Sequence, residues 1–516
     1  MSASTEKKLR QAAREAGTDK KTLALEKEAK EKAKSRRRWT LGTIAVVILI
    51  ALVLLVNSPL IYNSTAYSVG SRNFSAAEVS YHYASQYNSF ASQYGSYASM
   101  FGLDTSNGVN GLDKQDCPFT DGSWKDYFLD AARNEMLQIT ALTDYAAANG
   151  ISLDESEKAP ILSAFDGLKE TARLYGYGSA DKMLAANYGA GVTQKLVQNA
   201  YFESALASKV ISEVTEGFTY SHEELEEHYQ GYAGAKDYFD YSYVYIAAEQ
   251  VDPDGEDGEQ PAAATDETRA AAKALADAIA QSYKEIGTEE ETVSQRMTDA
   301  AAANGQSSTD QRRVAGSSLP AAKEWMMDSA RRAGDITVEA DGSESGYYVV
   351  AFTGRDDNHY KTASVRHILV KAEAAEDGTY SEEAKAAAKA KAEQILAEFE
   401  AGDRSEESFA ALAEQYSEDA GSNTNGGLYE NVARGQMVEE FDAFCFGGHK
   451  PGDTGIVYGE SSAYAGYHVM YYVGEGELYS DTLALNDLRT AAQESWMEEL
   501  LSGYETKDGF GLRFVK

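Results

Sequence analysis

Four residues in the C-terminal third of the chain have types and positions suited to holding an apolar ring beside polar groups. His367 and His468 each lie in a short apolar run that is typical of a strand. A neutral imidazole carries one donor and one acceptor nitrogen, so it can orient a polar neighbour. Met437 and Phe441 are four residues apart, so on a helix they would share one face and could grip an apolar ring.

Other kinds of active site find no support in the sequence. His222 and His228 are six residues apart, so a helix would not present both to one metal ion as a four-residue spacing would. The chain has no glycine-rich phosphate loop and no strand-Ser-helix nucleophile elbow, which argues against nucleotide and serine-hydrolase chemistry. We therefore expect no metal and no cofactor.

The charge of the chain is strongly acidic and unevenly distributed. The formal net charge is −35, yet residues 1–38 hold 13 basic and 6 acidic side chains, whereas residues 57–516 hold 34 basic and 76 acidic ones. Phosphate binding requires concentrated Lys and Arg, so the acidic part argues against nucleic acid as a partner. Basic or unfolded polypeptides are more plausible partners for the acidic residues 57–516.

An uncharged run of 18 residues, 39–56, separates the basic tail from the acidic part. As a helix it would be about 27 Å long, close to the thickness of the hydrocarbon core of a membrane. By the positive-inside rule, residues 1–38 would be a cytoplasmic tail and everything after residue 56 would be extracytoplasmic. The alternative is a cleaved signal peptide, but the nearest small-x-small site, Ser64 with Ala66, lies well past the run. We expect a single-pass anchor in the cell membrane.

Residues 66–235 are expected to form an all-helical module. Ser75 and Glu78 have the spacing of a capping box, and the aromatic residues that follow recur every three or four positions, which would place six rings on one helix face. Two interpretations stay open for this stripe: the buried core of the module, or a surface for unfolded client segments. Its members are Tyr83, Tyr87, Phe90, Tyr94, Tyr97 and Phe101.

Residues 239–355 and 360–476 share one plan and indicate an internal repeat. Each begins with a β-rich run, continues with two helical segments and closes with another β-rich run. The helices are expected at about 266–285 and 290–304 in the first repeat, and at about 381–400 and 406–418 in the second. Residues 480–516 contain a final amphipathic helix that should pack on the helical module.

The second repeat resembles the parvulin family of peptidyl-prolyl isomerases, and together its motifs are highly specific. They are Arg366-His367-Ile368-Leu369-Val370, Phe409–Ser417, Gly426-Gly427, Gly435–Phe441, Pro451-Gly452-Asp453 and Gly466-Tyr467-His468.

This resemblance implies an α+β domain with a four-stranded antiparallel sheet wrapped by helices. It also implies that His367 and His468 lie side by side beneath a substrate groove, with Asp419 facing them. The proline-ring pocket would be formed by Met437 and Phe441, together with Phe446, and Tyr429 falls where the family often has Leu.

Proline isomerisation suits these residue types because it needs no nucleophile, metal or cofactor. An X-Pro bond turns over a barrier of about 18–20 kcal/mol, since twisting destroys the amide resonance. Two interpretations of the imidazole pair stay open, catalysis or hydrogen bonds that fix the sheet, and Asp419 is either a groove residue or a plain helix-end carboxylate. Residues 426–430 lack the usual third glycine and acidic residue, and residues 461–464 approach the last strand unusually.

The layout of the whole chain resembles bacterial SurA-like and PrsA-like foldases. That resemblance implies a membrane-anchored isomerase and chaperone for unfolded secreted polypeptides that contain X-Pro bonds. The alternative is a non-catalytic holdase whose parvulin-like units only bind peptides. In the first repeat Tyr243 and Tyr348 align with His367 and His468, so we expect a parvulin-like fold without activity, although plain core tyrosines would look the same.

Overall fold

The fold is described from a computed structural model, which describes residues 3–17, 20–56, 58–232, 234–251, 263–286, 292–320, 322–343 and 345–515. The chain divides into two compact units. Unit 1 consists of residues 1–218 and 490–516, and unit 2 consists of residues 219–489. Residues 219–235, which the sequence groups with the helical module, lie in unit 2.

Unit 1 is mainly helical, with one small sheet in the order β13-β1-β2. Its strands are β1 (Thr65–Val69), β2 (Arg72–Ser75) and β13 (Thr506–Asp508). Its helices are α1 (Ala3–Glu15), α2 (Lys20–Val56), α3 (Pro59–Tyr62), α4 (Ala76–Tyr94), α5 (Trp124–Asn149), α6 (Glu155–Ala164), α7 (Leu168–Leu174), α8 (Ala180–Tyr188) and α9 (Gln194–Gly217), with 3₁₀ turns at Gly95–Phe101, Leu112–Lys114 and Phe510–Phe514.

The capping signals of unit 1 act as the sequence predicts. Ser75 accepts a hydrogen bond from the Glu78 N–H, and the Glu78 side chain accepts from the Ser75 N–H, so α4 begins with a complete capping box. Helix α5 begins after Ser123 and ends at Gly150, whose φ of 72° is the left-handed conformation that terminates helices.

The aromatic stripe proves to be mostly core, and the expectation of six rings on one helix face is wrong. Helix α4 ends at Tyr94 because Gly95 takes a φ of 49°, and the chain continues as a 3₁₀ turn. Tyr83 and Tyr87 are buried in the main core of unit 1, and Phe90, Tyr94 and Phe101 pack against that core. Tyr97 lies outside it, with 67% of its surface exposed.

The run expected to span a membrane, residues 39–56, forms the last part of α2. No helix among the described residues is sufficiently long and apolar to cross a membrane. The side chains of residues 50–56 lie outside the described part of the structure, so the expected span is only partly covered.

The C-terminal end of the chain belongs to unit 1. The second half of α17 (Tyr479–Ser502) contributes Trp496, Met497 and Leu500 to a cluster around Leu142 and Val210 of α5 and α9. Strand β13 then pairs antiparallel with β1. The end of the chain thus packs on the helical module from which it is separated by about 270 residues of sequence.

Unit 2 contains two four-stranded antiparallel sheets, in the orders β6-β3-β8-β7 and β10-β9-β12-β11. In both, the first and last strands in sequence are the central pair, so the two sheets share one topology. The strands of the first are β3 (Tyr238–Ala247), β6 (Thr309–Ala315), β7 (Ile336–Ala340) and β8 (Gly346–Asp356), and those of the second are β9 (Lys361–Lys371), β10 (Leu428–Val432), β11 (Thr454–Glu460) and β12 (Ala465–Leu478). The predicted repeat is therefore present in the fold.

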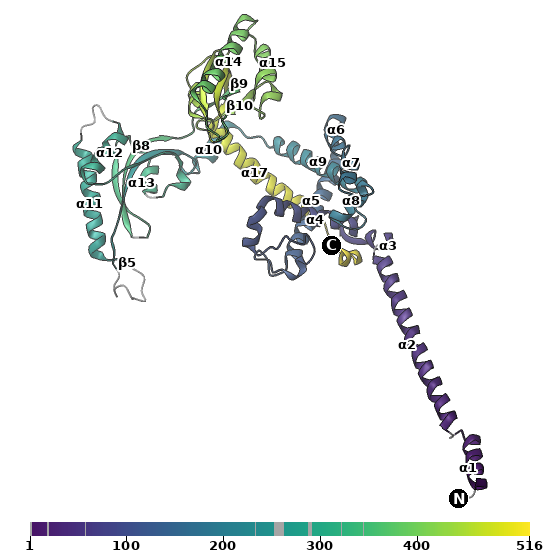
Figure 1. Ribbon diagram of the computed structural model, residues 1–516. Coiled ribbons are helices and arrows are strands. Elements are labelled where there is room, and N and C mark those ends of the chain that lie inside the picture. Colours follow the sequence, from purple (N-terminus) through teal and green to yellow (C-terminus); the bar gives the residue numbers. More distant parts are fainter. Residues whose placement is uncertain are drawn as a thin grey trace. The chain divides into compact units, whose positions relative to one another are not determined.

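The helices of unit 2 also occur in matching places. Two long helices follow the first strand of each sheet, and one short helix precedes the third strand; Figure 1 shows α11 and α12 on one side of the first sheet and α13 on the other. They are α11 (Asp266–Glu285), α12 (Val293–Ala303) and α13 (Lys323–Met327) in the first repeat, and α14 (Glu382–Ala401), α15 (Glu406–Tyr416) and α16 (Glu439–Cys445) in the second. Unit 2 also has α10 (His222–Gln230), the two-residue strands β4 (Gln250–Val251) and β5 (Ala263–Ala264), and 3₁₀ turns at Gly316–Ser318 and Asn423–Asn425.

The second sheet has a different core on each face. Ile368, Val370 and Val469 pack against the α14 and α15 layer. On the other face Val365 and Met470 pack against α16 and its neighbours. Because successive side chains of a strand point to opposite faces, His367 and His468 fall on the α16 side.

Candidate functional site

His367 and His468 come together at the centre of the second sheet. In the register of β9 and β12, His367 pairs with Met470 and His468 pairs with Leu369, so the two histidines are diagonal neighbours on one face. Each is only 3% exposed. Their Nδ1 atoms are 3.0 Å apart and their rings are stacked with centroids 5.2 Å apart. The structure thus places the two imidazoles side by side, as the resemblance implies.

Asp419 lies at the outer end of the imidazole pair. Its Oδ2 is 3.0 Å from Nε2 of His367, and it accepts hydrogen bonds from the hydroxyls of Ser422, at 2.6 Å, and Tyr429, at 3.0 Å. The hydrogen bond from His367, together with those from Ser422 and the Gly421 N–H, holds the pKa of Asp419 well below its usual range. Asp419 is therefore a carboxylate in contact with His367, and its catalytic role stays a prediction.

Tyr464 lies at the opposite end, where its hydroxyl is 2.9 Å from Nε2 of His468. Burial, and next the neighbouring His367, lower the pKa of His468 to about 3. His468 is accordingly neutral at physiological pH. Each of the four ring nitrogens of the pair has a hydrogen-bond partner within the protein.

An apolar cluster covers the imidazole pair. The ring of Phe441 stands edge-on to both imidazoles, with centroids 5.4 Å from His367 and 5.3 Å from His468, and Phe441 is 2% exposed. Met437, Phe446 and Tyr429 are partly buried and pack against the cluster that contains Phe441. The structure therefore brings together all the residues that the sequence assigns to the proline pocket.

Two details of this pocket differ from the sequence-based expectation. Met437 does not lie on the helix with Phe441, because α16 begins at Glu439 and Val438 has an extended backbone with ψ of 152°. Tyr429 uses its hydroxyl to bind Asp419. The substrate-binding role predicted for Tyr429 stays a prediction, and the structure gives it a second task in the hydrogen-bond network.

Two residues of the site, Ser422 and Tyr464, were not identified from the sequence. Ser422 is 1% exposed and its Oγ lies 3.0 Å from Nε2 of His367. Its position three residues after Asp419 is a signal that could have suggested a shared hydrogen bond. Tyr464 lies in the turn that the sequence marks only as an unusual approach to the last strand.

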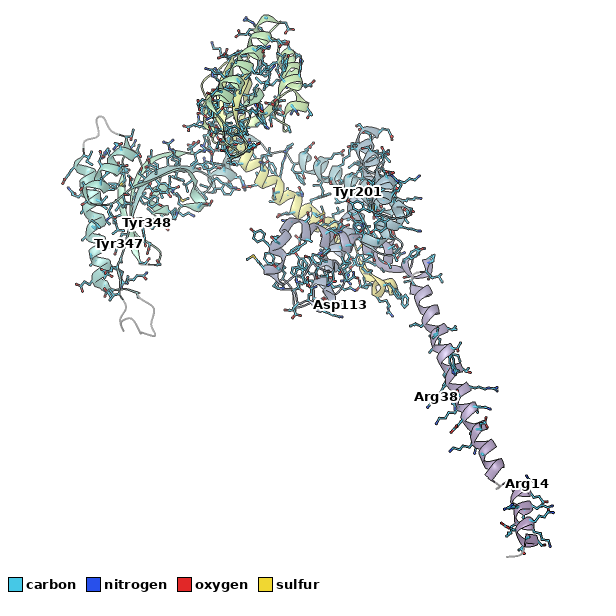
Figure 2. The ribbon with its side chains drawn as sticks, viewed as in Figure 1. Arg14, Arg38, Asp113, Tyr201, Tyr347 and Tyr348 are labelled. Carbon is cyan, nitrogen blue, oxygen red and sulfur yellow. The ribbon has the colours of Figure 1, made fainter. Side chains whose placement is uncertain are left out.

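The first sheet carries tyrosines at the positions equivalent to the histidines. Tyr243 pairs with Val350, and Tyr348 pairs with Tyr245, which is the same offset as in the second sheet. The rings of Tyr243 and Tyr348 are 5.8 Å apart. Tyr347, beside Tyr348 on β8 (Figure 2), packs on the other face against α11 and α12. The predicted alignment of both tyrosines with the histidines therefore agrees with the register.

Metal-binding clusters and disulfides do not occur in the part of the chain that the structure describes. No three residues among His, Cys, Asp and Glu gather there in a way that would hold a metal ion. Cys117 and Cys445 are both buried and unpaired with each other. Burial raises the pKa of the Cys445 thiol to about 12, so it is protonated and unreactive at neutral pH.

Comparisons with known proteins found one family match and several similar solved structures. Residues 347–471 match the family described as the PPIC-type PPIASE domain. A search of curated proteins found no match. Among solved structures, the chain is similar to a peptidylprolyl isomerase (PrsA) from Bacillus anthracis, at 24% identity over 28% of this chain and 59% of that one, with a TM-score of 0.18.

Two further PrsA structures match a larger part of the chain at lower identity. PrsA from Bacillus subtilis is 11% identical over 75% of this chain and 90% of that one, with a TM-score of 0.24. Foldase protein PrsA from Streptococcus pneumoniae is 11% identical over 71% of this chain and 81% of that one, with a TM-score of 0.23. The family match to residues 347–471 confirms the prediction that the chain carries a parvulin-type peptidyl-prolyl isomerase domain.

Proposed function

We propose that this chain, whose parvulin-type domain makes it a peptidyl-prolyl isomerase, acts as a foldase for unfolded or partly folded secreted polypeptides. The observation that carries the proposal is the buried pair of His367 and His468 with the ring of Phe441 over both imidazoles. A polar pair that is fixed beneath an apolar cluster offers what a twisting X-Pro bond requires.

The chemistry follows from the barrier to rotation. An X-Pro bond must lose its amide resonance over about 18–20 kcal/mol, so a catalyst needs only to bind the twisted amide better than the planar one. The apolar side chains of Met437, Phe441 and Phe446 would hold the pyrrolidine ring while the preceding residue turns. Fixed dipoles beside the ring favour the changed charge distribution of the twisted amide without reorganising.

Isomerase activity can be measured on residues 57–516 with a peptide that contains one X-Pro bond. We expect acceleration of cis/trans exchange that persists with a metal chelator present. Replacing both histidines by alanine should remove the acceleration, and the helical content should remain as in the parent chain. If the peptide in the presence of the folded parent chain still exchanges with the uncatalysed time constant of about 10–100 s, isomerase activity is refuted.

A holdase function is the second candidate, and a feature of unit 1 favours it. Tyr97, Met100 and Phe119 are 67%, 77% and 51% exposed, so unit 1 presents three large apolar side chains that an unfolded segment could contact. Suppression of aggregation of an unfolded client by the chain with both histidines replaced would support chaperone activity that is separate from isomerisation. Loss of that suppression in a triple serine variant of these residues would locate it in unit 1.

The proposed location is outside the cytoplasmic membrane, with residues 1–38 in the cytoplasm. This proposal rests on the sequence: 13 basic residues precede the uncharged run, and residues 57–71 carry no charge. Protease added to intact cells should degrade the bulk of the chain and leave the tail protected. Protection of residues 57–516 until the membrane is opened would show the opposite orientation.

A further inference from the structure

The hydrogen-bond network of the isomerase site ends at Tyr464, which belongs to neither the imidazole pair nor the apolar pocket. Tyr464 is the last residue of the turn between β11 and β12, four residues before His468. The N–H of Ser461 donates to the Tyr464 carbonyl at 2.8 Å, which closes this turn. The closed turn thus holds the partly buried phenol of Tyr464 against the imidazole of His468.

The donors and acceptors of the network can be assigned from its opposite end. Asp419 is a carboxylate and can only accept, so Nε2 of His367 must carry a hydrogen. The Oγ of Ser422 donates to Asp419 and therefore accepts from the same Nε2–H. This fixes one end of the chain of hydrogen bonds.

The contact between the imidazoles then allows two patterns. The Nδ1 atoms are 3.0 Å apart, and a single hydrogen must lie between them. If His468 supplies it, both imidazoles are neutral and Nε2 of His468 is a bare acceptor. If His367 supplies it, His367 is a buried cation and the hydrogen of His468 lies on Nε2.

Tyr464 takes part in both patterns through His468 Nε2: its hydroxyl would donate to Nε2 in the neutral pattern and accept from Nε2–H in the other. Burial raises the pKa of Tyr464, so the phenol keeps the hydrogen that it would donate to a bare Nε2 in the neutral pattern. Donation by Tyr464 satisfies the neutral pattern completely and leaves no buried imidazolium. A buried acceptor without a donor would be destabilising.

We propose that Tyr464 is a positioning residue of the isomerase site: its hydroxyl donates to Nε2 of His468 and holds the imidazole pair in one neutral tautomer. In this pattern Tyr464 donates to His468, His468 Nδ1–H donates to His367, and His367 Nε2–H donates to Asp419. No imidazole nitrogen is left to exchange a proton with substrate, so the pair acts as a fixed dipole beneath the pocket. The inference rests on the proposed isomerase function for its effect on rate.

The test is the Tyr464→Phe variant of the full chain, with Tyr467→Phe as the matched control. Tyr467 is also a partly buried tyrosine of the same hairpin, but it packs on the opposite face of the sheet, against α14 and α15. Two readouts are needed: the nitrogen resonances of the seven histidines after selective ¹⁵N labelling, and kcat and KM for an X-Pro peptide. The His468 resonances are identified by their loss in His468→Gln.

In the parent chain and in Tyr467→Phe we expect His468 to carry its hydrogen on Nδ1 and none on Nε2. In Tyr464→Phe we expect a mixture of tautomers and a fall in kcat of about five- to thirty-fold, as the loss of one buried hydrogen bond would give, with KM unchanged. A hydrogen on Nε2 of His468 in the parent chain would overturn the proposal. So would unchanged resonances and kcat in Tyr464→Phe. If the parent chain has the expected tautomer but does not accelerate exchange, the proposed function fails and the tautomer assignment stands.

Discussion

His367 and His468 show how two polar rings can be buried in a sheet. Each is 3% exposed among apolar neighbours such as Val365 and Met470. An imidazole nitrogen without a partner in such a place would cost free energy, and here all four have one. The hydrogen bonds of the pair thus satisfy both buried imidazoles, and this one arrangement is compatible with the structural and with the catalytic interpretation.

The low pKa of His468 predicts how the stability of the domain depends on pH. Burial lowers this pKa from 6.5 to about 3, so between these values the unfolded chain binds a proton that the folded chain does not. The free energy of unfolding should therefore rise with pH up to about 6.5 and level off above it, with a slope of about 1.4 kcal/mol per pH unit at most from this group.

Denaturant unfolding of residues 360–476 between pH 5 and pH 8 measures this slope. The window avoids the contribution of Asp419, whose lowered pKa adds stability that is lost only at more acidic pH. In His468→Gln the pH dependence of the free energy of unfolding between pH 5 and pH 6.5 should lose most of the slope of about 1.4 kcal/mol per pH unit that His468 contributes. An unchanged slope in a folded His468→Gln would mean that His468 is protonated in the native state.

Met437 offers the clean test of the proline pocket, because it is only partly buried, whereas Phe441 is 2% exposed. Phe441→Ala would cost about 3–5 kcal/mol of stability, so its loss of activity would not separate binding from folding. Met437→Ala should lower kcat/KM about tenfold and leave the midpoint of thermal unfolding nearly unchanged. Leu412→Ala, a partly buried residue on the opposite face, is the control and should retain full kcat/KM.

At the residue scale, the sequence predicted the residues whose identity is part of a motif. The resemblance names the positions of His367, His468, Asp419 and Phe441, and the structure brings these side chains together, while their roles stay predictions. Ser422 and Tyr464 were missed because their roles depend on where two turns place a hydroxyl, and the distances of 3.0 and 2.9 Å follow from the backbone rather than from spacing.

At the scale of elements, the loop before β10 determines where His367 lies. The N–H of His367 donates to the carbonyl of Gly427 at 2.9 Å, and the Arg366 side chain donates to the carbonyls of Asn425 and Gly426 at 3.0 Å. Gly427 has a φ of 72°, and a Cβ there would lie 2.2 Å from the His367 carbonyl oxygen. Only glycine allows the loop to approach the strand so closely.

Gly427→Ala should accordingly lower both stability and activity. The left-handed backbone alone disfavours alanine by about 1–2 kcal/mol, and the clash with backbone adds to this by displacing His367. Gly378→Ala is the matched control, since Gly378 also has a positive φ, of 81°, but nothing lies within 4 Å of a Cβ there. The control should lose a similar amount of stability from strain and keep its kcat, whereas Gly427→Ala should lose kcat as well. Equal kcat in the two variants would show that the loop does not position His367.

The elements that the sequence predicted well are those with strong periodic signals. The helices expected at about 381–400 and 406–418 are observed as Glu382–Ala401 and Glu406–Tyr416. The aromatic stripe misled because its spacing continued past Gly95, where the backbone leaves the helix. A periodic pattern indicates which side chains face the core, but a single residue with positive φ can end the element within it.

At the scale of the molecule, the repeat of a fold does not repeat the site. Both sheets of unit 2 have the same strand order, and Tyr243 and Tyr348 occupy the places of His367 and His468. A phenol offers one oxygen on a longer side chain, so two of them cannot form the chain of four nitrogen contacts that the imidazoles form. Tyr348 also packs against Tyr245, with ring centroids 4.7 Å apart and the ring planes tilted by 44°.

We therefore expect residues 236–358 to fold alone without catalysing proline isomerisation, and removal of residues 361–478 from the full chain to abolish the activity. The excision is feasible because its ends are adjacent: the N–H of Tyr479 donates to the Tyr360 carbonyl at 2.9 Å, and that of Ser480 donates to the Asn358 carbonyl at 3.0 Å. A short glycine linker can thus join Tyr360 to Tyr479.

The control is the full-length chain with both histidines replaced by alanine, which should be equally inactive while it keeps the second sheet. Circular dichroism measures whether each chain folds, and an X-Pro peptide assay measures whether it catalyses exchange. Catalysis by the isolated first repeat would show that phenols suffice, and would contradict the assignment of the activity to the imidazole pair.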